Sequence, residues 1–221
     1  MVSLSGNNLT PTTKINIAHI NHVRIAVNPE NPTDVFLEWF EIARNAQPLF
    51  PEMMVLSTVS KAGRPRNRAV LLKQVDRRGF VFFSNYRSRK GRDLDNCPYA
   101  ALNFTWLSLE RQVSVEGEVV VLSEAESDLY WKQRPRGSRL GAWASSQSAP
   151  IGSREEMLQK YREQETQYEG RDVPRPAHWG GYRLLPVRIE FWLGKQDRFH
   201  DRFVFQRDDL ESAWVCQRLQ P

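Results

Sequence analysis

The apolar residues of one early segment recur every three or four positions, as on one face of a helix: Val35, Phe36, Trp39, Phe40 and Ala43. This spacing predicts a helix over 34–46. Thr33 is its expected N-cap, because a threonine hydroxyl accepts a hydrogen bond from a free amide of the first turn. Pro48 and Pro51 follow, and since proline cannot continue a helix, we expect the helix to end before them.

From residue 53 onward the pattern changes to short segments typical of strands. The predicted strands are 53–60, 67–75, 80–84, 99–107, 112–122, 181–193, 200–206 and 213–219. Turn sequences with Gly63 and Gly79 separate the first three, which indicates an antiparallel meander. In a later strand, Gln112 and Ser114 alternate with valines. One face of that strand is therefore polar and available to line a site.

Three more helices are expected between the strands. A short basic helix is predicted over 88–96 and a charged surface helix over 153–168. Ser123 and Glu126 form the capping-box pattern, which predicts the start of another helix that ends near Gln133.

Strands outnumber helices and do not alternate with them regularly. The sequence therefore predicts a mainly β, α+β fold, with one barrel domain over 31–221 and peripheral helices. Residues 1–30 are polar and show no sustained period, so we expect a flexible N-terminal arm there.

Composition narrows the kind of protein. The 221 residues carry a formal charge of +5, which makes anionic partners plausible. Cys97 and Cys216 form no CxxC pair and the four histidines form no HExxH pair, so neither a disulfide framework nor a metal site is expected. The first 30 residues lack the pattern of a secretory signal, and nowhere does an apolar run reach the length of a membrane span. We expect a cytoplasmic protein.

Arg198, His200 and Arg202 occupy alternate positions of a segment whose sequence is typical of a strand. A period of two places all three on one face, where neighbouring cations repel unless an anion or solvent meets them. The alternative is a solvated strand face neutralised by Asp197 and Asp201.

Two segments suggest a phosphate site. Arg68 and Lys73 bracket an apolar strand, and cations at such positions either meet an anion or extend into water. If Ser88 caps the next helix, Arg89 and Lys90 occupy its first turn, where the helix dipole disfavours cations. A phosphate bound by the free amides and the cations would resolve this conflict, although a solvent-facing basic helix is the simpler alternative.

A second anion site is expected near the break at Pro135. Tyr130 and Arg134 lie four residues apart, and Ser138 follows just beyond the break. Their hydroxyl and guanidinium groups suit a second phosphate, but an exposed helix end has the same pattern. Further along, Gln147 and Ser148 offer an amide and a hydroxyl to the edge of a heterocycle, or form an ordinary polar loop.

The chain has no GxGxxG, P-loop or GxSxG motif, which argues against Rossmann cofactors, triphosphate hydrolysis and hydrolase chemistry. Taken in order from about residue 32 to the C-terminus, its motifs resemble the pyridoxamine 5′-phosphate oxidase family. The segments that carry the resemblance are RAVLLK (68–73), SRK (88–90), LERQV (109–113), RPR with Ser138 (134–138), GAW (141–143), QS (147–148), WGGYR (179–183), IEFW (189–192) and RFHDR (198–202).

The resemblance implies a split β-barrel homodimer with flavin mononucleotide (FMN) in clefts between the subunits. The FMN-binding residues that it implies are Arg68, Ala69, Val70, Leu71, Leu72, Lys73, Phe83, Ser84, Arg89, Lys90, Gln112, Gln147, Ser148, Trp192 and Arg202. The implied substrate-binding residues are Lys73, Tyr130, Arg134, Ser138, Arg198, Phe199 and His200. Among these, Arg198 and His200 are the catalytic candidates and are expected to orient the substrate ring and tune its charge.

The implied reaction is the oxidation of pyridoxamine or pyridoxine 5′-phosphate by dioxygen to pyridoxal 5′-phosphate. Hydrogen peroxide is released, with ammonia from the amine. The expected partners are a second copy of the chain, the phosphorylated B6 vitamer and dioxygen, without nucleic acid or membrane. Two departures stand out: Phe199 occupies a position where leucine is usual, and the segment 22–27 lacks the paired arginines followed by tyrosine that many relatives have.

Two alternatives stay open on the sequence. A flavin oxidase of phenazine biosynthesis would share the fold but would not need the second phosphate site formed by Tyr130, Arg134 and Ser138. A basic nucleic-acid-binding module would use the same cations, but it should present them as one continuous stripe. Here they occur in separate blocks between apolar strands.

Overall fold

The structure is a computed structural model that describes residues 31–46 and 49–221. The predicted arm over 1–30 and the helix-ending Pro48 lie outside the described residues. The first helix, α1 (Pro32–Ala46), forms where its apolar spacing predicts. The cap prediction was wrong, however: the amide of Thr33 donates to Asn31 Oδ1 at 2.9 Å, and Thr33 itself is buried in the first turn. Asparagine caps as well as threonine does, and it stands one residue before the helix.

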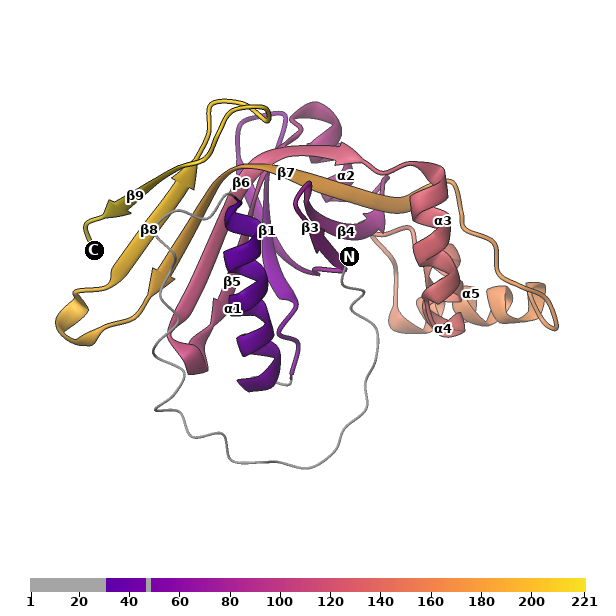
Figure 1. The fold of residues 1–221 in the computed structure, drawn as a ribbon. Coiled ribbons are helices and arrows are strands. Elements are labelled where there is room, and N and C mark those ends of the chain that lie inside the picture. The colour runs from indigo at the N-terminus through magenta and orange to yellow at the C-terminus, as the bar shows by residue number, and fades with distance from the viewer. Residues whose placement is uncertain (1–30, 47–48) are drawn as a thin grey trace.

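The strands form one antiparallel sheet that curls around α1 (Figure 1). The nine strands described are β1 (Met53–Val59), β2 (Pro65–Leu71), β3 (Gln74–Asp76), β4 (Gly79–Asn85), β5 (Tyr99–Trp106), β6 (Arg111–Val121), β7 (Trp179–Leu193), β8 (Asp201–Gln206) and β9 (Val215–Leu219). Their order is β2-β1-β5-β6-β7-β4-β3, while β8 pairs with β7 and β9. The predicted strand 67–75 is in fact two strands, because the chain leaves the sheet after Leu71 and pairs again from Gln74.

Aromatic packing between α1 and the sheet builds the core. The ring of Phe36 lies 4.8 Å from that of Phe80 and 4.9 Å from that of Phe104. On the next turn of the helix, Trp39 meets Phe191 edge to face at 5.3 Å. All five side chains are fully buried. This packing fixes the inner face of the barrel, so the groups that could meet a ligand lie at its outer edges.

Four α-helices and two short 3₁₀ turns complete the described chain outside α1: α2 (Arg89–Asn96), α3 (Glu124–Gln133), α4 (Arg136–Ala144), α5 (Arg154–Gln167), η2 (Leu107–Leu109) and η3 (Gln196–Arg198). The Ser123–Glu126 capping box is confirmed. Helix α4 was not predicted: Pro135 ends α3 but also serves as the N-cap residue of a new helix. Figure 1 shows α3, α4 and α5 together at one end of the molecule and β8 and β9 at the other.

The predicted alternation of Arg198, His200 and Arg202 on one strand face was wrong. Asp197 and Arg198 have φ values of 55° and 63°, so the chain turns at η3, and β8 begins only at Asp201. A period of two does not run through such a turn. In the described residues no helix is long and apolar enough to cross a membrane, and the predicted cytoplasmic location stays a prediction.

Candidate active site

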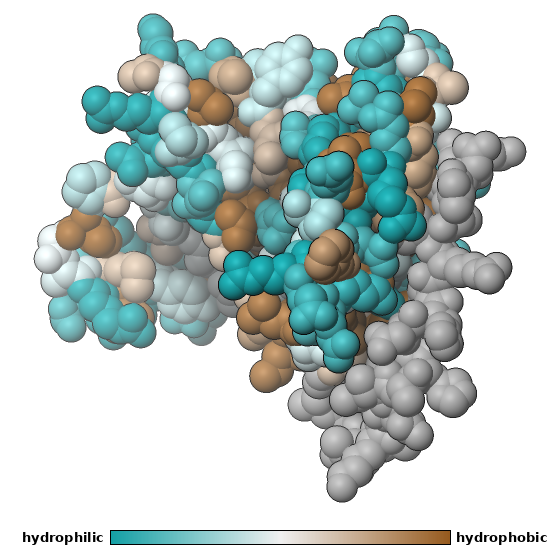
Figure 2. All heavy atoms as spheres, turned by 90° about the vertical axis from the view of Figure 1, so that its left-hand side faces the viewer, coloured by the Kyte–Doolittle hydropathy of each residue, from teal (hydrophilic) through white to brown (hydrophobic). Residues whose placement is uncertain are grey.

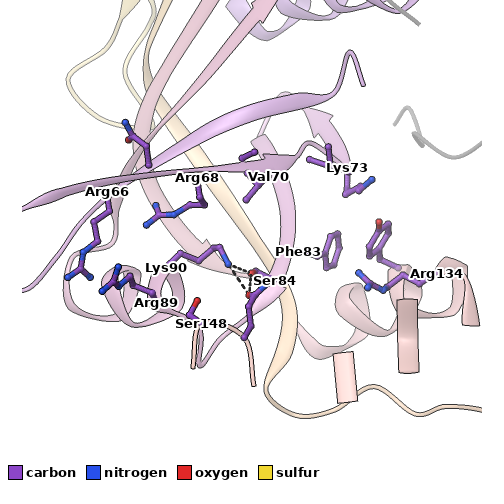
Figure 3. A pocket seen from close by; sticks show the side chains of 15 residues that line it. Arg66, Arg68, Val70, Lys73, Phe83, Ser84, Arg89, Lys90, Arg134 and Ser148 are labelled. Carbon is purple, nitrogen blue, oxygen red and sulfur yellow. Dashed lines mark hydrogen bonds between the residues drawn. The ribbon is translucent and has the colours of Figure 1, made fainter. Parts of the chain in front are cut away.

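A cleft of about 690 Å³ opens between β2, the end of β4 and the start of α2, and it extends to the end of α3 (Figure 3). Six of its side chains are cationic, and among the described residues that line it none is acidic. The lining residues are Arg66, Asn67, Arg68, Ala69, Val70, Leu71, Lys73, Phe83, Ser84, Arg89, Lys90, Tyr130, Arg134, Gln147 and Ser148. Such a cleft favours anionic ligands.

The cations form two groups at opposite ends of the cleft, with Val70 and Phe83 between them (Figure 3). We call the group of Arg66, Arg68, Arg89 and Lys90 the α2 end, and the group of Lys73, Tyr130 and Arg134 the α3 end. Two separated cationic groups suit two separate anions.

Helix α2 begins directly at its end of the cleft. The Ser88 hydroxyl caps the helix by accepting from the amide of Gly91 at 3.3 Å, as the sequence predicts. Gly91 itself packs on the backbone of Tyr86 so closely that a Cβ would lie 1.9 Å from the Tyr86 carbonyl oxygen. Only glycine allows this contact, which holds the first turn of α2 and its basic side chains against the cleft.

Lys90 is a buried cation surrounded by neutral oxygens. Its Nζ donates to Ser84 Oγ at 2.8 Å, to Gln147 Oε1 at 2.9 Å and to Ser88 Oγ at 3.2 Å. Burial, and secondarily the charge of Arg68, lowers the pKa of Lys90 to about 8. Because desolvation is what disfavours its charge, a bound anion would stabilise the ammonium.

Aromatic rings form the wall of the cleft beside the α3 end. The rings of Phe83 and Tyr130 stack at 3.9 Å with 19° between their planes, and Trp179 continues the stack at 5.4 Å from Phe83. Burial raises the pKa of Tyr130, so its hydroxyl stays protonated and able to donate a hydrogen bond. This wall gives a flat ligand an apolar surface beside polar groups.

At the α3 end, the guanidinium of Arg134 lies over the ring of Trp179, with Cζ 4.4 Å from the ring centroid. Its Nη2 donates to the carbonyl of Ser138 at 3.0 Å, while its buried Nε has no hydrogen-bond partner in the described part of the chain. Burial lowers the pKa of Arg134, and burial likewise lowers that of Lys73. Arg134 lines the cleft, so its guanidinium charge can attract an anionic ligand.

Most of the predicted site residues line this cleft, with two exceptions nearby. Ser138 lines an adjoining hollow of about 320 Å³, which shares Phe83, Ser84 and Arg134 with the cleft. Leu72 is fully buried in the core under α1 and does not line the cleft. Arg68 and Lys73, which stand at the two ends of this motif, line the cleft, whereas Leu72 packs in the core.

The remaining predicted residues form a second group on the sheet. Gln112, Trp192 and Arg202 are register partners across β6, β7 and β8, and the His200 ring lies 4.6 Å from that of Trp192. Arg202 Nε donates to Glu190 Oε1 at 2.8 Å. We call Gln112, Trp192, His200 and Arg202 the β8 row.

The β8 row lies among the residues at the other end of the molecule from α3, α4 and α5 (Figure 1). Arg198 and Phe199 are exposed in the turn before it, and Phe199 has 76% of its surface exposed. Figure 2 shows this end, where apolar side chains are interspersed with polar ones. None of the β8 row lines the cleft of the same chain.

Arg66 and Asn67 line the cleft but were not predicted. The signal was available: Arg66 has the same parity as Arg68 and therefore faces the same side of β2. Both residues were missed because the site residues of this strand were taken from the family resemblance, which begins at Arg68; the strand was also predicted to start at Asn67, whereas β2 begins at Pro65.

Comparisons with known proteins agree with this geometry. Residues 45–168 match the family described as "Pyridoxamine 5'-phosphate oxidase", and residues 179–221 match "Pyridoxine 5'-phosphate oxidase C-terminal dimerisation region". The chain is 53% identical to a pyridoxine/pyridoxamine 5'-phosphate oxidase of Paraburkholderia phytofirmans over 86% of its own length and 89% of that relative. It is 52% identical, with the same coverage, to one of Cyanothece sp..

Two solved structures resemble the fold. PhzG from Burkholderia lata, in complex with tetrahydrophenazine-1-carboxylic acid, is 29% identical with a TM-score of 0.82 and covers 96% of this chain and 100% of its own. An FMN-binding protein of Nostoc punctiforme, 15% identical, has a TM-score of 0.71 and covers 89% of this chain and 99% of its own. The predicted mainly β split barrel with peripheral helices is confirmed.

Proposed function

Because the chain belongs to the pyridoxamine 5′-phosphate oxidase family, we propose that its cleft holds FMN at the α2 end and a phosphorylated B6 vitamer at the α3 end. The chain is an FMN-dependent pyridoxine/pyridoxamine 5′-phosphate oxidase. The assignment of the cofactor to one end and the substrate to the other rests on one observation. The cleft has two cationic ends, and its described lining has no carboxylate.

The donor set of the α2 end fits FMN. A phosphate monoester needs several cations, and Arg66, Arg68, Arg89 and Lys90 provide four. The buried ammonium of Lys90 donates only to neutral acceptors, so a phosphate at this end would supply the counter-charge that it lacks. Beyond the cations, Gln147 and Ser148 offer polar groups to the edges of a heterocycle, and the backbone of 69–71 offers amides and carbonyls.

The α3 end fits the phosphate of the substrate. Lys73, Tyr130 and Arg134 bring two cations and a phenol to one place. Ser138 holds Arg134 through its carbonyl, which leaves its hydroxyl as a further donor from the adjoining hollow. We expect this anchor to place the pyridine ring of the substrate beside the cofactor, because positioning supplies much of the rate when reactants must meet face to face.

When bound, FMN would supply the two-electron redox chemistry that carries a hydride equivalent from C4′ of the substrate to dioxygen, which is released as hydrogen peroxide; with the amine substrate, water then hydrolyses the oxidised C4′–N bond and ammonia leaves. The chain's own groups bind and orient. Lys90 keeps a proton at Nζ for the cofactor phosphate, and Tyr130 keeps its phenolic proton for the substrate phosphate. Arg198 and His200 are assigned to the substrate ring, where they fix its orientation.

The β8 row needs a second copy of the chain to reach a cleft. Residues 179–221 match a dimerisation region, and this segment contains Trp192, Arg198, His200 and Arg202. In a homodimer with two-fold symmetry, each chain can give its β8 row to the cleft of the other. We therefore assign Gln112, Trp192 and Arg202 to the FMN of the partner chain, and Arg198, Phe199 and His200 to its substrate.

The main test is a comparison of substrates. Purified protein should be yellow and should release peroxide with pyridoxamine and pyridoxine 5′-phosphates, and far less with their unphosphorylated forms. A phenazine-type tricyclic carboxylate belongs in the same assay, because the fold also resembles that of PhzG. Faster turnover of the tricyclic acid than of the phosphates would reverse the assignment of the α3 end.

Sharing of the site is tested by mixing two inactive variants, Arg134→Ala and Arg198→Ala. A mixed dimer has one cleft that lacks both arginines and one that lacks neither. After random exchange of chains, activity should return to about a quarter of the wild-type value, because half of the dimers are mixed and each has one intact cleft. No recovery after verified exchange would show that both arginines act in the cleft of the same chain.

A further inference from the structure

A buried carboxylate lies behind the α2 end and does not line the cleft. Asp93, on the inner face of α2, is 4% exposed, and Thr58 on β1 is 1% exposed. The Thr58 hydroxyl donates to Asp93 Oδ2 at 2.9 Å. Asp93 is thus held from β1, a strand that is 35 residues away in the sequence.

The same two residues hold the guanidinium groups of β2. Arg68 Nη1 donates to Thr58 Oγ1 at 2.7 Å and to the carbonyl of Leu56 at 3.0 Å. Arg68 Nη2 lies 3.6 Å from Asp93 Oδ2, and Arg66 Nη1 lies 2.7 Å from Asp93 Oδ1. The Thr58 hydroxyl is used in both directions, since it accepts from Arg68 and donates to Asp93.

This arrangement has an electrostatic reason. Arg66 and Arg68 repel each other, and burial together with the charges of Arg66 and Arg89 lowers the pKa of Arg68, while Asp93 raises it. A buried carboxylate is costly unless it is paired and hydrogen-bonded, and here Asp93 accepts from Thr58 and Arg66 and also forms an ion pair with Arg68. Four cations against one carboxylate leave the α2 end strongly positive. Asp93 can therefore orient the arginines without cancelling their attraction for a phosphate.

We propose that Thr58 and Asp93 are positioning residues that hold Arg68 in the orientation that binds the FMN phosphate. The proposal rests on the assignment of FMN to the α2 end. It adds that a network outside the cleft determines how well the phosphate is bound. Riboflavin lacks the phosphate, so its affinity should not depend on this network.

The decisive variant is Thr58→Val, which keeps the shape of the side chain and changes no charge. Flavin is removed from the full-length variant, and FMN and riboflavin are each titrated by the quenching of flavin fluorescence. The variant removes the two hydrogen bonds that Thr58 makes to Asp93 and Arg68, while Arg68 keeps its contacts with the Leu56 carbonyl and Asp93. Because the phosphate contact is only loosened and not removed, the Kd of FMN should rise about 3- to 10-fold, and that of riboflavin should stay roughly unchanged. Thr166→Val, the same substitution at an exposed position on α5, is the control and should change neither.

A double-mutant cycle separates positioning from a general loss of structure. If Thr58 acts through Arg68, Thr58→Val should have almost no further effect on FMN binding in an Arg68→Met background. An equal loss of FMN affinity in both backgrounds, or an equal loss for FMN and riboflavin, would overturn the proposal.

Asp93→Asn is the second variant and keeps the experiment informative if Thr58→Val folds poorly. The amide preserves the acceptor for Thr58 but no longer attracts the two arginines, so FMN affinity should fall. Tighter FMN binding by Asp93→Asn would mean that Asp93 only weakens the positive charge of the α2 end, and the positioning role would be wrong. Should the wild-type chain bind FMN and riboflavin equally, the assignment of the α2 end itself fails. If the wild-type chain prefers FMN and both variants keep that preference, only the positioning role fails.

Discussion

The two ends of the cleft hold their cations by different means. At the α2 end, Arg66 and Arg68 pair with the buried Asp93, and Lys90 is held by three neutral oxygens. At the α3 end, Arg134 is held by stacking on Trp179 and by the Ser138 carbonyl. One end is fixed by charge and hydrogen bonds, and the other by an aromatic surface.

The difference corresponds to what each end is proposed to bind. A cofactor stays bound through many turnovers, so orienting its cations in advance raises affinity by lowering the cost of ordering them. A substrate must enter and its product must leave. Arg134 lines the cleft and pairs with no carboxylate in the described chain, so its charge is available to each new phosphate. The same kinds of cation thus retain the cofactor at the α2 end and allow substrate and product to exchange at the α3 end.

The largest expected effect comes from removing one of the two cations of the α3 end. Arg134→Gln should lower kcat/KM for pyridoxamine 5′-phosphate by about 10²- to 10⁴-fold, because two charge-assisted hydrogen bonds to a phosphate are lost. The Kd of FMN should stay near the wild-type value. Steady-state peroxide assays and flavin titration measure the two effects, and Arg162→Gln on the exposed face of α5 is the control. Equal losses in both measurements would mean that the ends do not act separately.

The opposite variant acts on the α2 end. Arg89→Ala should raise the Kd of FMN by about 10- to 100-fold through loss of one charge-assisted hydrogen bond, with little change for riboflavin. Enzyme saturated with FMN should keep its KM for substrate. Arg92→Ala is a control on the same helix, since Arg92 is exposed and donates only to the Arg87 carbonyl among its recorded contacts. A changed KM with an unchanged FMN affinity would assign Arg89 to the substrate instead.

The smallest effect concerns pH. Burial lowers the pKa of Lys90 to about 8, so the flavin-free chain loses this charge as pH rises through 8, and FMN affinity should fall a few-fold above that pH. Between about 8 and the ordinary value of 10.5, the unfolded chain binds the proton that the folded chain has lost. The contribution of Lys90 to the free energy of unfolding therefore rises with pH in this window. FMN titrations and thermal melts of wild type and Lys90→Met from pH 6.5 to roughly 10 test both signs. A variant with the wild-type pH dependence would exclude Lys90 as the group that titrates.

Local sequence signals predicted the elements that carry the site. The conflict between the basic first turn and the helix dipole indicated the α2 end, and the capping box fixed the start of α3. Signals that depend on tertiary structure were out of reach: Thr58 and Asp93 meet only after β1 packs against α2. The left-handed backbone of Asp197 and Arg198 also has no signature in the side-chain pattern. For this reason the predicted alternation of Arg198, His200 and Arg202 on one strand face was wrong.

The lining of the cleft, with six cations and no carboxylate in its described residues, has a practical consequence for the bench. Before any flavin is added, such a cavity concentrates small inorganic anions from the solution. Phosphate or sulfate buffers should then compete at both ends, and added salt should screen the attraction. Apparent affinities for this enzyme will be comparable only between solutions of matched ionic composition.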